Sequence, residues 1–199
     1  MPISSAPIQL DTPATDIAEI SLFGPGIGEC IVIHLGSGRW FIVDSCLCPI
    51  TKKPIALQYL ESIDVNVAEQ VIGILITHWH SDHIQGACNL FKACLSAKLY
   101  IPSPMKTKEA FNLAFMYRND AFSGVGDEIE EFRNLMIHLR TQNFQDQLDT
   151  IKARHTFFDD RSGLPVIPTR LVALSPSNVA VTQATSKFSQ IKPSSNSDR

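Results

Sequence analysis

The sequence predicts a layered α/β fold, and three observations support this prediction. Strand-like apolar runs alternate with segments whose apolar residues recur at helical spacing. A group of three strand-like runs, separated by glycine-containing turns, precedes this alternation. A later run, at 71–77, is almost wholly apolar and β-branched, as expected of a central strand that is covered on both faces. The 199 residues are enough for about one domain.

The first half of the chain predicts an antiparallel meander followed by a helix. Strand-like runs lie at 18–24, 29–35 and 39–44, and the turn sequences GPGIG and GSG separate them. The segment 54–63 begins with a proline and then places apolar residues at helical spacing, which predicts a first helix. The strand at 71–77 follows it.

The rest of the chain continues the alternation of helices and strands. The amphipathic segment 127–142 carries acidic residues in its first turn, where the helix dipole favours them. A strand at 97–102 is expected to run parallel to the strand at 71–77. The remaining expected elements are helices at 82–95 and 106–119 and strands within 153–158 and 165–176.

Composition indicates one domain with short extensions. We expect a loose, Pro/Ser/Thr-rich arm at 1–15, a domain at 16–176, and a helix that runs into a polar tail at 177–199. The net charge is −3 and the isoelectric point is near 6.0, so no global field attracts nucleic acid or an anionic membrane. The chain shows no secretory signal and no apolar run that could cross a bilayer, which predicts a cytoplasmic protein without membrane contact.

The stretch ITHWHSDHIQGA at 76–87 concentrates metal-binding residue types behind the predicted central strand. Three of the six histidines lie here, together with an aspartate: His78, His80, Asp82 and His83. Histidines two apart on an extended segment project to one side and can share an ion, for which imidazole suits zinc well. After a turn at Ser81, Asp82 and His83 can reach a second ion a few Å away. The spacing predicts a dinuclear hydrolytic site, against the alternative of a surface loop or helix cap.

These residues also resemble a known family. THWHSDH matches the H-x-H-x-D-H signature of the metallo-β-lactamase fold superfamily, and Gly86 stands where that motif continues with a glycine. FIVDSC at 41–46 resembles the family's strand that ends in an aspartate, here Asp44. The opening FGPGIGECIVIHLGSGRWFIVD is similar to the branch related to competence-type DNA-uptake hydrolases. The resemblance spans roughly 17–102.

The resemblance implies an αββα sandwich that binds two metal ions, zinc in the first place, with manganese or iron as alternatives. By this resemblance His78 and His80 bind the first ion, and Asp82 and His83 serve the second. Asp82 also helps to orient the attacking water, and Asp44 lies beneath the metals and holds their ligands by hydrogen bonds. The implied reaction is attack of metal-activated water on an ester, amide, thioester or phosphodiester.

The second half of the chain departs from the family pattern, which requires further ligands from later strands. His155 is the candidate for a third metal ligand, whereas His138 lies on the amphipathic helix with charged neighbours. No apolar strand ending in the expected bridging aspartate follows residue 177, and Asp159 and Asp160 are weak substitutes. We therefore expect the first half of the fold to be present and the second half to be incomplete.

Three explanations for the incomplete ligand set stay open. We favour the explanation that the sequence is a truncated chain or fragment; the others are that a homo-oligomer completes the site and that the site is reduced and mononuclear. The leading function is a metallo-hydrolase acting on a small-molecule or ester-type substrate. The alternatives are an inactive, truncated or degenerate metal-binding domain, and a nucleic-acid phosphodiesterase, which the acidic charge disfavours.

Overall fold

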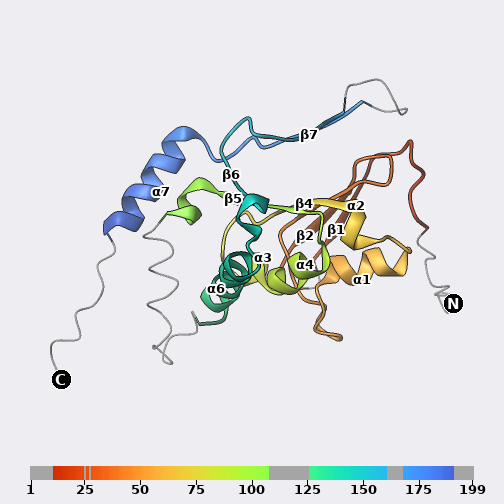
Figure 1. Cartoon of the computed structure of the whole chain (residues 1–199), viewed down its shortest axis with the longest axis horizontal. Coiled ribbons are helices and arrows are strands. Elements are labelled where there is room, and N and C mark those ends of the chain that lie inside the picture. Colours follow the sequence, from red (N-terminus) through yellow and green to blue (C-terminus); the bar gives the residue numbers. More distant parts are fainter. Residues whose placement is uncertain (1–10, 25, 27, 108–125, 161–167, 191–199) are drawn as a thin grey trace, which may run out of the picture.

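The protein is built on a six-stranded sheet whose strands lie side by side in sequence order (Figure 1). The computed structural model describes residues 11–24, 26, 28–107, 126–160 and 168–190. The strands of this sheet are β1 (Glu19–Phe23), β2 (Cys30–His34), β3 (Trp40–Val43), β4 (Val71–Leu75), β5 (Lys98–Pro102) and β6 (Leu148–Ile151).

The mode of strand pairing changes once across the sheet, at β3. β1, β2 and β3 pair antiparallel, and β3, β4, β5 and β6 pair parallel. The predicted meander and the predicted parallel strand at 97–102 are thus confirmed. β6 was not predicted, because it has four residues of which only Ile151 is buried. β6 is a strand because it pairs with β5, and its own sequence pattern does not indicate one.

Helices cover one face of the sheet. They are α1 (Ile55–Ser62), α2 (Val67–Gln70), α3 (Ser81–Ile84), α4 (Ala87–Ala93) and α6 (Gly126–Thr141). The chain also forms two 3₁₀ turns, η1 (Ser103–Lys106) after β5 and η3 (Phe144–Gln147) before β6. The helices predicted at 54–63 and 127–142 are confirmed. Most of the helix predicted at 106–119 falls outside the described residues.

The helix predicted over 82–95 is interrupted, and glycine at position 86 explains the break. Gly86 has φ +78°, a left-handed conformation, and separates α3 from α4. A Cβ atom there would lie 2.6 Å from Leu47 Cδ2 and 3.1 Å from Pro54 Cγ. A glycine is therefore required both for the turn and for the close packing of the preceding loop.

The larger hydrophobic core lies between the sheet and this helical layer. It includes residues of β2, β3, β4, β5, α1, α4 and α6. Trp40, Leu60, Ile74 and Phe132 are each at most 1% exposed. Burial of large side chains from widely separated segments is what holds the helices on this face.

A smaller core covers part of the opposite face, under a two-stranded hairpin. The hairpin is formed by β7 (Thr156–Asp160) and β8 (Thr169–Val172), and Phe41, Leu75, Tyr100 and Ile151 are buried beneath it. The predicted strand 153–158 begins later because Ala153 and Arg154, the latter with φ +70°, form a turn. Helix α7 (Asn178–Gln190) follows the hairpin, and Figure 1 shows it beyond one end of the sheet.

The architecture is a mixed α/β layered fold, as predicted, in which the layer opposite the helices is limited to a two-stranded hairpin within the described residues. Helices, a six-stranded sheet and a two-stranded hairpin form successive layers (Figure 1). Residues 12 and 15 of the predicted arm contact the domain, since Thr12 Oγ1 donates to the Ile63 carbonyl and Ser37 N donates to the Thr15 carbonyl. None of the helices in the described ranges combines the length and apolarity needed to cross a bilayer.

Candidate metal centre

The histidine-rich loop begins at the carboxyl end of β4, in the middle of the sheet. Ile76 is fully buried and its N–H donates to the Tyr100 carbonyl, which extends the strand by one residue. Residues 77–80 then run as a loop to α3, where the Ile84 side chain is also fully buried. The loop is therefore anchored in the core at both ends, and the potential ligands lie between these anchors.

Backbone hydrogen bonds fix the loop against two neighbouring segments. Glu29 N donates to the Asp82 carbonyl at 2.9 Å, and Ser45 N donates to the His83 carbonyl at 2.8 Å. Gly28, in the GPGIG turn, makes the first contact possible: a Cβ atom there would lie 2.9 Å from the Asp82 carbonyl oxygen. The glycine-rich turn thus serves the site as well as the meander.

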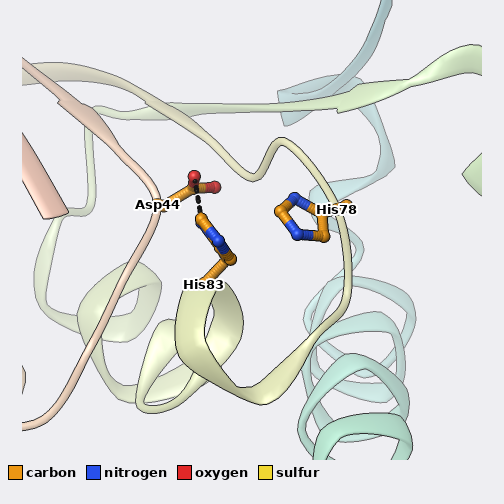
Figure 2. Close-up of side chains that lie close together, drawn as sticks. All are labelled: Asp44, His78 and His83. Carbon is orange, nitrogen blue, oxygen red and sulfur yellow. Dashed lines mark hydrogen bonds and ion pairs between the residues drawn. The ribbon is translucent and has the colours of Figure 1, made fainter. Parts of the chain in front are cut away.

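Asp44 is the buried acceptor at the centre of this arrangement (Figure 2). The residue is 6% exposed and adopts φ +60° directly after β3. Its carboxylate accepts hydrogen bonds from Thr77 N and Thr77 Oγ1, each at 2.7 Å, and from His83 Nδ1 at 2.9 Å. Burial raises the pKa of Asp44, and the hydrogen bonds from Thr77 and His83 act in the opposite direction.

These hydrogen bonds assign the tautomers of two histidines. The Thr77 hydroxyl gives its single proton to Asp44, so it accepts from His78 Nδ1–H, which lies at 2.9 Å. His83 Nδ1–H donates to Asp44. In the neutral rings a lone pair is therefore on Nε2, which for His83 lies 3.4 Å from Asp82 Oδ2. The Asp44 carboxylate thus determines the tautomers of both histidines, directly for His83 and through Thr77 for His78.

The structure brings together all four predicted ligands and Asp44. Ligand atoms of His78, His80 and Asp82 lie within 4.8 Å of one another, as do those of Asp44, His78 and His83. The rings of His78 and His83 have centroids 4.0 Å apart, with both rings beside the Asp44 carboxylate in Figure 2. Burial, followed by the nearby His83, lowers the pKa of His78, which favours the neutral imidazole that binds metals.

The donor set fits a divalent transition metal. Imidazole nitrogens with one or two carboxylates are the ligands expected of zinc, and manganese or iron accept them as well. The buried side of the cluster is held by hydrogen bonds, whereas His80 is exposed and the Asp82 side chain is 45% exposed. The open side leaves room for a water molecule or substrate.

The remaining predicted candidates lie outside these two donor groups. The His155 ring packs edge-to-face on Tyr100 and Phe157, with centroids 5.5 and 5.0 Å away. Its role as a third ligand stays a prediction. Asp160 forms an ion pair with Arg39, and Asp159 lies 3.6 Å from Arg170 Nε, which places both carboxylates in contacts of the hairpin.

Thr77 is the functional residue that the sequence interpretation missed. It lies directly before the first histidine of the motif, in a position that reads as the end of a β-branched strand. Its hydroxyl nevertheless connects Asp44 to His78. The available signal was a hydroxyl-bearing residue directly before a predicted ligand, in a sequence that already predicts Asp44 as a hydrogen-bonding partner of the ligands.

The fold and the convergent donor residues agree with the match to one protein superfamily. The chain belongs to the metallo-β-lactamase superfamily, whose family model, Lactamase_B, matches residues 23–155. Membership supports a metal-dependent hydrolase in general. The match covers strands β2 to β6, the ligand loop and helix α6, and it ends at His155.

The solved structures that are similar to this chain include the following two. One is the hydrolase AbOPH of the beta lactamase superfamily, with 16% identity over 67% of this chain and a TM-score of 0.42. The other is AidC, a dizinc quorum-quenching lactonase in complex with the product N-hexnoyl-L-homoserine, with 12% identity over 64% of this chain and a TM-score of 0.42. The chain spans 44% of the length of each. No curated protein matches the sequence.

Proposed function

We propose that this chain carries the ligand loop of a zinc-dependent hydrolase that acts on a small-molecule ester, amide, thioester or phosphodiester. The observation that carries the proposal is the convergence of His78, His80 and Asp82, whose ligand atoms lie within 4.8 Å of one another, with His83 adjacent. Convergent imidazole and carboxylate donors at the carboxyl end of a central strand suit a metal-assisted hydrolase.

The chain's own residues have distinct roles in this proposal. Nε2 of His78 and a ring nitrogen of His80 hold one ion, and Asp82 with Nε2 of His83 serves a second. Asp44 and Thr77 position His78 and His83 through the hydrogen bonds described above. The exposed Asp82 carboxylate also accepts a hydrogen bond from the attacking water and orients it. When bound, the metal supplies Lewis-acid activation of that water and of the scissile group.

A complete dinuclear centre needs donors in addition to these four. We propose His155 as the further donor within this chain, with a second copy of the chain as the other source. His155→Ala should then lower the metal content of the purified protein, and a dimer in solution should retain more metal than a monomer. Unchanged metal content in His155→Ala would remove this residue from the ligand set.

The deciding experiment is metal stoichiometry. The purified protein is loaded with zinc, passed through a desalting column and measured by plasma mass spectrometry. We expect close to two ions per chain for a completed centre and close to one for a reduced centre. The His78→Ala/His80→Ala double variant should lose at least the ion that these residues share.

His138→Ala provides the matched control, because this histidine lies on α6 and its ring contacts Phe91 and Phe144. It should retain the metal content of the unsubstituted protein. Equal metal content in the double variant and in this control would contradict the proposed ligands. Hydrolysis of p-nitrophenyl acetate and of bis-p-nitrophenyl phosphate by the zinc-loaded protein then distinguishes an ester substrate from a phosphodiester substrate.

A further inference from the structure

A large cavity adjoins the candidate metal centre on the face of the sheet opposite the main helical layer. It has a volume of about 620 Å³, within the range of about 300–1,000 Å³ that is usual for small-molecule sites. Its walls come from the sheet, from η1, from β8 and from the first two turns of α7. Phe41 and Leu75 lie at the sheet wall, and Leu171, Ala180 and Ala184 lie at the opposite wall.

The lining of this cavity is almost entirely apolar. Among the lining residues that the structure describes, only Thr77, His78, Trp79 and Ser175 have polar atoms in their side chains, and none has a charged carboxylate, ammonium or guanidinium group. A phosphate or another strongly hydrated group would lose its water shell here without compensation. A hydrocarbon group, in contrast, would gain from leaving water.

The polar residues of the lining connect the cavity to the ligand loop. Thr77, His78 and Trp79 are consecutive residues of that loop, and all three line the cavity. His78 belongs to both groups of convergent donors. A molecule in the cavity therefore reaches the metal centre at one end, while the rest of it contacts apolar walls.

We propose that the cavity binds the hydrocarbon part of the substrate, so that the enzyme acts on small molecules with an aliphatic acyl chain or a comparable apolar group next to the hydrolysed bond. That the bound molecule is a substrate rests on the proposed function. The preference for an apolar ligand rests on the lining of the cavity alone. The uncharged lining selects against nucleotides and against charged peptide side chains.

The size of the effect follows from burial of methylene groups. Each methylene transferred from water into the cavity should raise affinity about fourfold. The rise should stop once the cavity is filled, because a longer chain must extend into solvent. If the ligand binds only through its polar end, affinity should instead be independent of chain length.

The first measurement is equilibrium binding of 1-butanol, 1-hexanol and 1-octanol to the full chain. These alcohols have no hydrolysable bond, so the result does not depend on bound metal or on activity. Trp79, which lines the cavity, reports binding through its fluorescence, while Trp40 is buried on the other face of the sheet. We expect affinity to rise about fourfold with each methylene.

A matched pair of variants on α7 tests the location. Ala180 lines the cavity and is exposed at its mouth, so Ala180→Trp should fill the space without disturbing the core. Gln183 lies on the same helix, is exposed and does not line the cavity, so Gln183→Trp is the control. Ala180→Trp should lower octanol affinity at least tenfold and Gln183→Trp should leave it unchanged, both measured by isothermal titration calorimetry because each variant adds a tryptophan.

The second measurement uses the zinc-loaded protein. The ratio of kcat/KM for p-nitrophenyl hexanoate to that for the acetate should be high, and Ala180→Trp should reduce this ratio selectively. Affinity independent of chain length, or equal loss in both variants, would overturn the inference even if metal is bound and acetate is hydrolysed. Chain-length-dependent binding in a protein that holds no metal would instead overturn the proposed function and leave an apolar-ligand site.

Discussion

The two faces of the six-stranded sheet differ in how completely they are covered. On one face, α1, α4 and α6 bury a continuous core that includes Trp40, Leu60 and Phe132. On the other face, the β7–β8 hairpin covers a much smaller cluster around Phe41 and Tyr100, and a cavity remains beside it. At the N-terminal edge of the sheet, Ile20 and Leu22 are 66% and 74% exposed.

This difference indicates that one face of the sheet mainly stabilises the fold and that the candidate site lies away from it. The helical face supplies most of the buried apolar surface, whereas the candidate ligands and the cavity lie at the carboxyl end of the strands and on the other face. Substitutions on the helical face should therefore affect unfolding, and substitutions at the site should affect metal binding. Four predictions test this separation.

The largest effect is expected from a cavity-creating substitution on the helical face. Leu60→Ala removes a fully buried side chain from α1 and should lower the free energy of unfolding by about 2–5 kcal/mol. Leu171→Ala, on the half-buried hairpin, should cost about 1 kcal/mol. Urea denaturation followed by circular dichroism measures both. Equal losses would show that the hairpin face contributes as much as the helical face.

Asp44→Asn should act mainly on metal binding. The asparagine retains the left-handed backbone, but its amide cannot accept from both Thr77 and His83 as the carboxylate does. Zinc affinity, measured by competition with a chromogenic chelator, should fall about 10–100-fold. Asp64→Asn is the control, since Asp64 is exposed and also has a positive φ of +58°. Equal zinc affinity in Asp44→Asn and Asp64→Asn would show that Asp44 does not position the metal ligands.

Thr77→Val should have a smaller effect of the same kind. It keeps the shape of the side chain but removes the hydroxyl that joins Asp44 to His78. Zinc affinity should fall about tenfold, because Nδ1 of His78 loses the acceptor that fixes its tautomer. Thr77→Ser restores the hydroxyl and should recover most of this loss. A serine variant as weak as the valine variant would point to packing instead of tautomer control.

The smallest effect concerns the pH dependence of stability on the helical face. His34, in β2, is 1% exposed, and burial lowers its pKa below the ordinary value of 6.5, with the Ile17 carbonyl and Glu19 acting in the opposite direction. The unfolded chain thus takes up this proton first as the pH falls. His34 should contribute no loss of stability above about pH 6.5, and a growing loss below it until the folded state is also protonated.

His34→Phe should therefore lose less stability than the unsubstituted protein between pH 7 and pH 5. Thermal unfolding in the presence of a chelator measures this and removes any contribution from bound metal. The difference between the two proteins isolates His34, since the other titrating groups are shared. Parallel curves for both proteins would show that protonation of His34 does not differ between the folded and unfolded states.

The sequence predicted the parts of the fold whose pattern is local. The glycine turns around the meander, the apolar β4 and the amphipathic α6 each have their own signal, and each was found at the expected place. β6 was missed because its residues alternate weakly and it becomes a strand only by pairing with β5. The break at Gly86 was also missed, because its cause is contact with Leu47 and Pro54, which are distant in sequence.

By itself the sequence determined the family and the ligand set to be tested, His78, His80, Asp82 and His83, because all four residues lie within one short loop. Only the tertiary structure decided how Asp44 reaches His83, how Thr77 connects it to His78, and that an apolar cavity lies beside them. The physical reason is distance along the chain. Side chains from β3, β4, β8 and α7 meet only after the strands have paired and the hairpin has folded back over the sheet.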